Sequence, residues 1–99
     1  MSGGERNARF VEFQDMVRQY HAHFSLGKFT RRQLIVKINR IFDFFLMHKD
    51  EILSEYRDAD KRENFVLIVW RKLNEFNDKP YADFELHRRR FREAFNLPE

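Results

Sequence analysis

The sequence predicts an all-α protein, a compact three- or four-helix bundle that forms a single domain over residues 1–99. Three observations lead to this prediction. Apolar residues recur at spacings of three and four along most of the chain, which is the pattern of helices with one buried face. Residues suited to helix capping stand before these stretches. Glycine occurs three times in 99 residues and no strand-turn-strand signal is present, so we expect short connections between antiparallel helices.

The first helix is expected from Arg6 to Phe24. One face of it carries the apolar residues Phe10, Phe13, Val17, Tyr20 and Phe24. Gly27 follows this pattern, at a place where a residue without Cβ can adopt the left-handed conformation that closes a helix. We expect the helix to end there, and about residues 1–5 to form a disordered N-terminus.

The second helix is expected to start near Arg31, because Thr30 and Gln33 have the spacing of a capping box. Two adjacent apolar stripes follow, Leu34, Ile38, Ile41 and Phe45 in one and Ile35, Phe42 and Leu46 in the other. A face this wide needs cover on more than one side, so this is expected to be the central helix. The polar run 48–51 either bends the helix or breaks it.

A third helix is expected after the capping pattern of Asp58, Asp60 and Glu63, in which Asp60 and Glu63 have capping-box spacing. The apolar run 65–70 alone would also suit a buried strand, but its continuation through Leu73 favours a helix. Within it, Trp70 is expected to be largely buried against Phe45 or its neighbours. Residues 77–80 form a predicted turn. Asp83 is the expected cap of a last helix whose apolar face consists of Phe84, His87, Phe91 and Phe95.

Several classes of protein are excluded by composition. The chain contains no cysteine, which rules out disulfides and thiolate chemistry. Its longest apolar runs are far shorter than the ~20 residues of a membrane-spanning helix. No apolar signal-peptide core is present near the N-terminus. An intracellular protein, cytoplasmic or nuclear and with an organelle left open, is the prediction.

Catalytic patterns are missing, although four histidines are present. His21 and His23 point about 200° apart on a helix and cannot share a metal as residues four apart can. His87 lies on the apolar face of the last helix and is expected to be a half-buried packing residue. His48 sits in a polar junction without a defined ligand set. No nucleophile elbow or phosphate-binding glycine loop occurs. We therefore expect no enzyme, metal site, cofactor or small-molecule substrate.

Charge is uneven along the chain, although 19 basic and 16 acidic residues nearly cancel. Residues 31–49 are basic and residues 50–64 are acidic, so the molecule is expected to have two charged poles. The candidate basic surface comprises Arg31, Arg32, Lys37, Arg40, Arg88, Arg89, Arg90 and Arg92. Guanidinium groups bind phosphate or carboxylate. A DNA-binding helical domain is therefore the alternative function.

The leading hypothesis is a non-enzymatic protein–protein interaction module, an adaptor or small subunit of a larger assembly. The second helix has more apolar surface than three short neighbours are expected to cover. We therefore expect part of one stripe to form a partner-binding or self-association surface. The candidate residues are Ile35, Phe42, Leu46 and Met47.

The sequence resembles two known families in part. The segments 56–58, 61–63 and 91–93, together with Trp70 and Phe95, are similar to the MADF family of DNA-binding and adaptor domains, but Arg88 stands where that family has a tryptophan. The short basic helices also resemble mitochondrial LYR-motif assembly proteins, although residues 55–57 read Glu-Tyr-Arg. Neither resemblance extends to a full motif, so no family is assigned.

Overall fold

The computed structural model describes residues 7–75 and 82–97, and all regular structure in these ranges is helical. Four long helices and one short one follow each other in the chain. They are α1 (Ala8–Leu26), α2 (Arg31–Met47), α3 (Lys49–Leu53), α4 (Ala59–Glu75) and α5 (Ala82–Phe95). The predicted all-α bundle is confirmed. The expected N-terminal disorder and the turn at 77–80 lie outside the described residues.

Local capping explains where the helices start and end. Asn7 caps α1, since its Oδ1 accepts hydrogen bonds from the backbone N–H groups of Arg9 and Phe10 at 2.9 and 3.2 Å. Gly27 closes α1 in the left-handed conformation with φ 67°, as predicted. The capping box of Thr30 and Gln33 at the start of α2 is confirmed with both of its hydrogen bonds.

The polar run after α2 breaks the helix. His48 has φ −115° and ψ 23°, outside helical geometry, and separates α2 from α3. At the start of α4, Asp58 of the predicted capping pattern accepts a hydrogen bond from the backbone N–H of Asp60 at 2.8 Å. The side chain of Arg62 donates to the carbonyl oxygens of Tyr56 and Arg57 and so holds the loop before α4. Residues 65–70 are helical, as the continuation of their pattern indicated.

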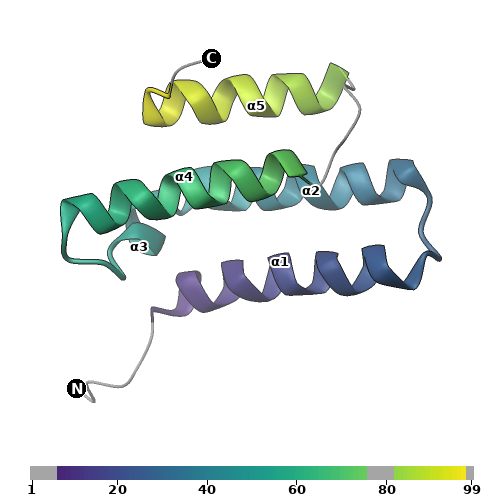
Figure 1. Ribbon diagram of the computed structural model, residues 1–99, viewed down its shortest axis with the longest axis horizontal. Coiled ribbons are helices and arrows are strands. Elements are labelled where there is room, and N and C mark those ends of the chain that lie inside the picture. Colours follow the sequence, from purple (N-terminus) through teal and green to yellow (C-terminus); the bar gives the residue numbers. More distant parts are fainter. Residues whose placement is uncertain (1–6, 76–81, 98–99) are drawn as a thin grey trace.

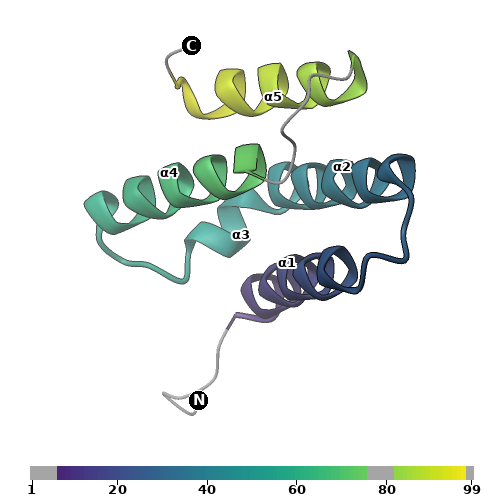
Figure 2. The ribbon, with the colours of Figure 1, turned by 45° about the vertical axis from the view of Figure 1, so that its right-hand side comes forward.

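The second helix is central, as predicted. α2 packs against α1 on one side and α5 on the other, and α3 turns back against α1 and α2 (Figures 1 and 2). α1 and α4 run in the same direction, opposite to α2 and α5 (Figure 1). The side chain of His87 bridges α5 to α2, with Nε2 3.0 Å from Oδ1 of Asp43. It is half-buried, as expected.

Aromatic rings fill much of the core. Phe91 is fully buried and contacts the rings of Phe42, Phe45, Trp70 and Phe95 at centroid distances of 4.9 to 5.6 Å. Trp70 is half-buried rather than largely buried, and it stacks on Phe91, which in turn stacks on Phe45. Phe91 therefore contacts aromatic rings from both α2 and α4.

Candidate functional site

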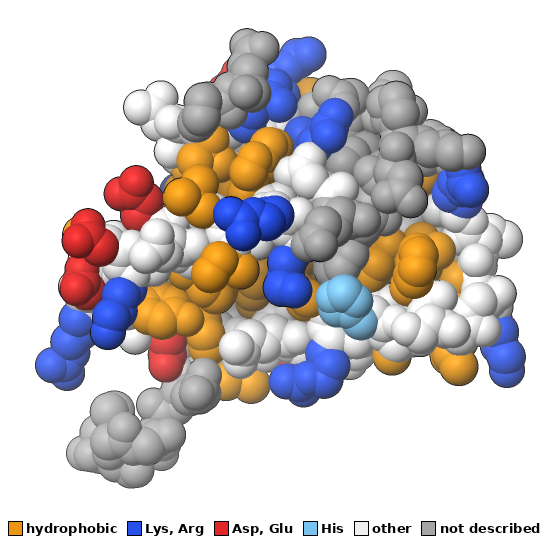
Figure 3. All heavy atoms as spheres, in the orientation of Figure 1, with side chains coloured by type: hydrophobic (Ala, Val, Ile, Leu, Met, Phe, Trp, Pro, Cys, Tyr) orange, Lys and Arg blue, Asp and Glu red, His pale blue; other side chains and the backbone are white. Residues whose placement is uncertain are grey.

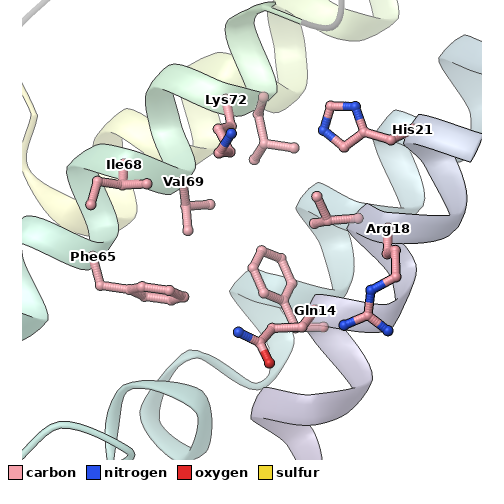
Figure 4. A pocket seen from close by; sticks show the side chains of 10 residues that line it. Gln14, Arg18, His21, Phe65, Ile68, Val69 and Lys72 are labelled. Carbon is pink, nitrogen blue, oxygen red and sulfur yellow. The ribbon is translucent and has the colours of Figure 1, made fainter. Parts of the chain in front are cut away.

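A groove lies on the surface between α1 and α4, with a volume of about 360 Å³. Its apolar lining comes from both helices and consists of Phe13, Val17, Phe65, Ile68, Val69 and Leu73. Gln14, Arg18 and His21 from α1 and Lys72 from α4 are the polar lining residues (Figure 4). This volume is within the range of roughly 300–1,000 Å³ that is typical of ligand-binding pockets.

The groove follows from the order of side-chain sizes along α1 and α4. Near the start of both helices the ring of Phe65 packs against Phe10 and Phe13, at centroid distances of 5.5 and 6.3 Å. These large rings set the distance between the helices. Further along, the lining residues Val17 and Val69 are shorter and do not fill the same distance. The surface therefore stays hollow over this stretch.

The floor of the groove is core, and its wall is accessible. Phe13, Val69 and Leu73 are each no more than 5% exposed. Ile68 is 48% exposed, although it lies beside this apolar floor. Figure 3 shows hydrophobic side chains at the surface over α4 and toward α1, with basic side chains around them. Water therefore reaches apolar surface that a partner could cover with a gain in free energy.

Among the described side chains, every charged or titratable residue that lines the groove is basic. Arg18 stands on the α1 side and Lys72 on the α4 side, and His21 lies near Lys72 at the same end (Figure 4). Arg18 Nη1 is 2.7 Å from Oδ1 of Asp15, but Asp15 is not a lining residue, and the Arg18 side chain is 74% exposed. Because an exposed pair of this kind contributes little, Arg18 can exchange Asp15 for a carboxylate of a ligand.

The four predicted partner-binding residues of α2 do not form a surface. Phe42 is 0% exposed and Ile35 is 9% exposed, so their expected place at an interface is wrong. α2 packs against both α1 and α5, and Phe42 meets Phe91 of α5, which the sequence pattern alone did not reveal. Leu46 is half-buried against the core, and Met47 alone of the four is exposed, at 74%.

The basic residues of α2 lie along an exposed part of that helix. Arg31 and Arg32 are in its first turn and are exposed. Lys37 and Arg40 follow one to two turns later and line a shallow hollow with Phe29. The Lys37 ammonium nitrogen lies 5.2 Å from the centre of the Phe29 ring, in a cation–π contact.

The arginines of α5 are not equivalent to one another. Arg88 is half-buried, and its Nη1 donates to Oδ1 of Asn74 at 3.0 Å, which joins α5 to α4. Arg89 and Arg90 are exposed, and Arg92 is half-buried. α5 meets α2 around Asp43, about 18 Å along the helix axis from Arg31 at 1.5 Å per residue. Arg40 is only three residues before Asp43, about 4.5 Å along the same axis, so the basic residues of α2 extend from Arg31 toward the arginines of α5.

Within residues 7–75 and 82–97, no group of three or more histidine, cysteine, aspartate or glutamate side chains is arranged to hold a metal ion. None of the helices described there has the length and apolar character needed to cross a membrane.

The comparisons add no relative. No family model matches the chain, and neither a curated protein nor a solved structure matches it. They give no support to the MADF or LYR resemblance.

Sequence reasoning missed the groove, although a signal for it was present. Residues 65–70 are six consecutive apolar residues, and on a helix with about 100° per residue they point in all directions. One buried face cannot accommodate all of them. Leu67 and Ile68 are accordingly exposed, at 37% and 48%, while Val66 and Val69 are buried. Part of the exposed apolar surface therefore lies on α4, at a place that the sequence analysis did not consider.

Proposed function

We propose that this protein is a non-enzymatic protein–protein interaction module, an adaptor or small subunit of a larger assembly, which binds its partner in the α1–α4 groove. The observation that carries the proposal is the exposed Ile68 beside the buried floor of that groove. Burial of apolar surface contributes roughly 25 cal/mol per Å², so a partner side chain that covers this residue gains affinity from it.

Several features favour a macromolecular partner over a small molecule. The groove is a surface hollow between two long helices, α1 and α4 (Figure 4). Apolar surface with a charged rim is the composition of protein interfaces.

The proposal is tested with a pair of matched variants. Ile68 and Val36 are both β-branched, helical and exposed, at 48% and 45%, but Val36 is not a lining residue of the groove. We expect Ile68→Asp to abolish capture of the partner from an extract of the source cells, because it places a charge in the apolar contact. Val36→Asp should capture the same partner as the unchanged protein. Equal capture by both variants would contradict the proposal.

DNA binding by α2 is a second candidate, favoured by Arg31, Arg32, Lys37 and Arg40 along one helix with Phe29 beside them. Four phosphate contacts predict that the affinity for duplex DNA falls roughly a hundredfold between about 50 and 200 mM salt, because bound counterions are released. Replacing Arg31 and Arg32 by alanine should reduce that salt dependence, whereas Ile68→Asp should not change it. An affinity that is independent of salt would exclude this candidate.

A further inference from the structure

We infer that the partner segment in the α1–α4 groove is an acidic amphipathic helix of two to three turns. The inference rests on the proposed function and specifies the chemistry of the occupant. Three properties of the groove carry it, namely its length, the type of backbone around it and the sign of the charge along its rim.

The length of the groove matches a short helix. The lining residues extend from Phe13 to His21 on α1 and from Phe65 to Leu73 on α4. Eight helical steps at 1.5 Å per residue correspond to about 12 Å on each side. Apolar residues at positions i, i+3 or i+4, and i+7 of a bound helix span about the same distance.

The surrounding backbone favours a helical ligand over an extended one. An added strand needs an exposed sheet edge, and the described part of the chain contains helices and no strand. A polyproline segment prefers a groove lined with aromatic rings. Beyond Phe13 and Phe65, the apolar residues that line this groove are aliphatic, namely Val17, Ile68, Val69 and Leu73. Ridges of a third helix pack well against such a surface.

The basic residues at the rim of the groove favour a ligand with negative charge. Arg18 and Lys72 come from opposite helices, so they flank a bound helix on both sides (Figure 4). Carboxylates beside the apolar stripe of the ligand would meet these two cations, and lysines would be repelled. His21 adds a third basic group at the end of the groove where Lys72 lies.

The test uses a pair of synthetic peptides of about 15 residues, long enough to form a helix. One has leucines spaced three and four residues apart with glutamates on both flanks, and the other has lysine in place of every glutamate. Titration into the isotopically labelled full chain should shift the amide signals of residues 13–21 and 65–73. We expect the glutamate peptide to bind at least about tenfold more tightly than the lysine peptide.

Charge-reversed variants provide the control. The double variant Arg18→Glu with Lys72→Glu should weaken binding of the glutamate peptide by about tenfold or more and strengthen binding of the lysine peptide. Arg89→Glu with Arg90→Glu changes the net charge by the same amount on exposed residues of α5 and should leave both affinities nearly unchanged. Equal loss in the two double variants would indicate a general effect of net charge and would overturn the inference.

Failure of the inference can be distinguished from failure of the proposed function. If Ile68→Asp abolishes partner capture while the glutamate peptide shows no binding or no preference over the lysine peptide, the groove binds a protein and the inference about its chemistry is wrong. Concentration-dependent dimerisation that Ile68→Asp removes would assign the groove to a second copy of the chain and would also overturn it. If Ile68→Asp leaves capture unchanged, the proposed function itself fails.

Discussion

Phe42→Asp is expected to unfold the protein. The Phe42 side chain is 0% exposed, with the Phe91 ring at 5.6 Å. An ionised carboxylate at this position has lost its water, and its burial costs several kcal/mol even after relaxation. A single domain is stable by only about 5–15 kcal/mol, and the lost ring contacts add to the cost. Circular dichroism and urea unfolding of the purified variant measure the effect.

Met47→Asp is the matched control for this prediction. It lies on the same helix and is 74% exposed, so the same charge should change stability by no more than about 0.5 kcal/mol. If Phe42→Asp retained the helical content and the urea midpoint of the unchanged protein, Phe42 would not be a core residue. That result would contradict the packing of α5 against α2 described above.

The second large effect is expected for Phe91→Ala. Phe91 is 0% exposed and contacts aromatic rings from both α2 and α4. Removing a buried phenylalanine side chain forfeits its transfer free energy and leaves a cavity, a loss of about 3–5 kcal/mol. The chain has a single tryptophan, Trp70, and it stacks on Phe91 at 5.3 Å. Its fluorescence therefore reports the same change, with an expected shift to longer wavelength in the folded variant.

Phe24→Ala provides the comparison for Phe91→Ala. Phe24 is 57% exposed near the end of α1, so the same truncation should cost much less. Urea unfolding of both variants gives the two free energies of unfolding. A loss below about 1 kcal/mol for Phe91→Ala would show that the aromatic cluster is not the centre of the core.

The helices were predictable because their signals are local. The left-handed Gly27 and the capping box of Thr30 and Gln33 depend on residues close in sequence, and both are confirmed. At the start of α4 the sequence contains two suitable caps, Asp58 and Asp60, and the backbone geometry makes Asp58 the acceptor. The break at His48 was left open for a similar reason.

The packing partners were not predictable in the same way. Whether the Phe42 stripe of α2 is covered depends on α5, whose Phe91 is 49 positions further along the chain. The periodicity of α2 shows that cover is needed but not which helix provides it. The groove was not predictable either, because it depends on how far apart α1 and α4 lie in the folded chain. The apolar run 65–70 indicated excess apolar surface, but not that α1 would lie beside it.

The central claim, that a protein partner lies in the α1–α4 groove, is tested most directly by site-specific photo-cross-linking in the source cells. A benzoylphenylalanine replaces Gln14 at the rim of the groove in one variant and the exposed Val36 on α2 in the other. The account predicts a discrete cross-linked protein from position 14, its loss when Ile68→Asp is added, and no such product from position 36. The same product from both positions, or one from position 14 that persists with Ile68→Asp, would contradict the account.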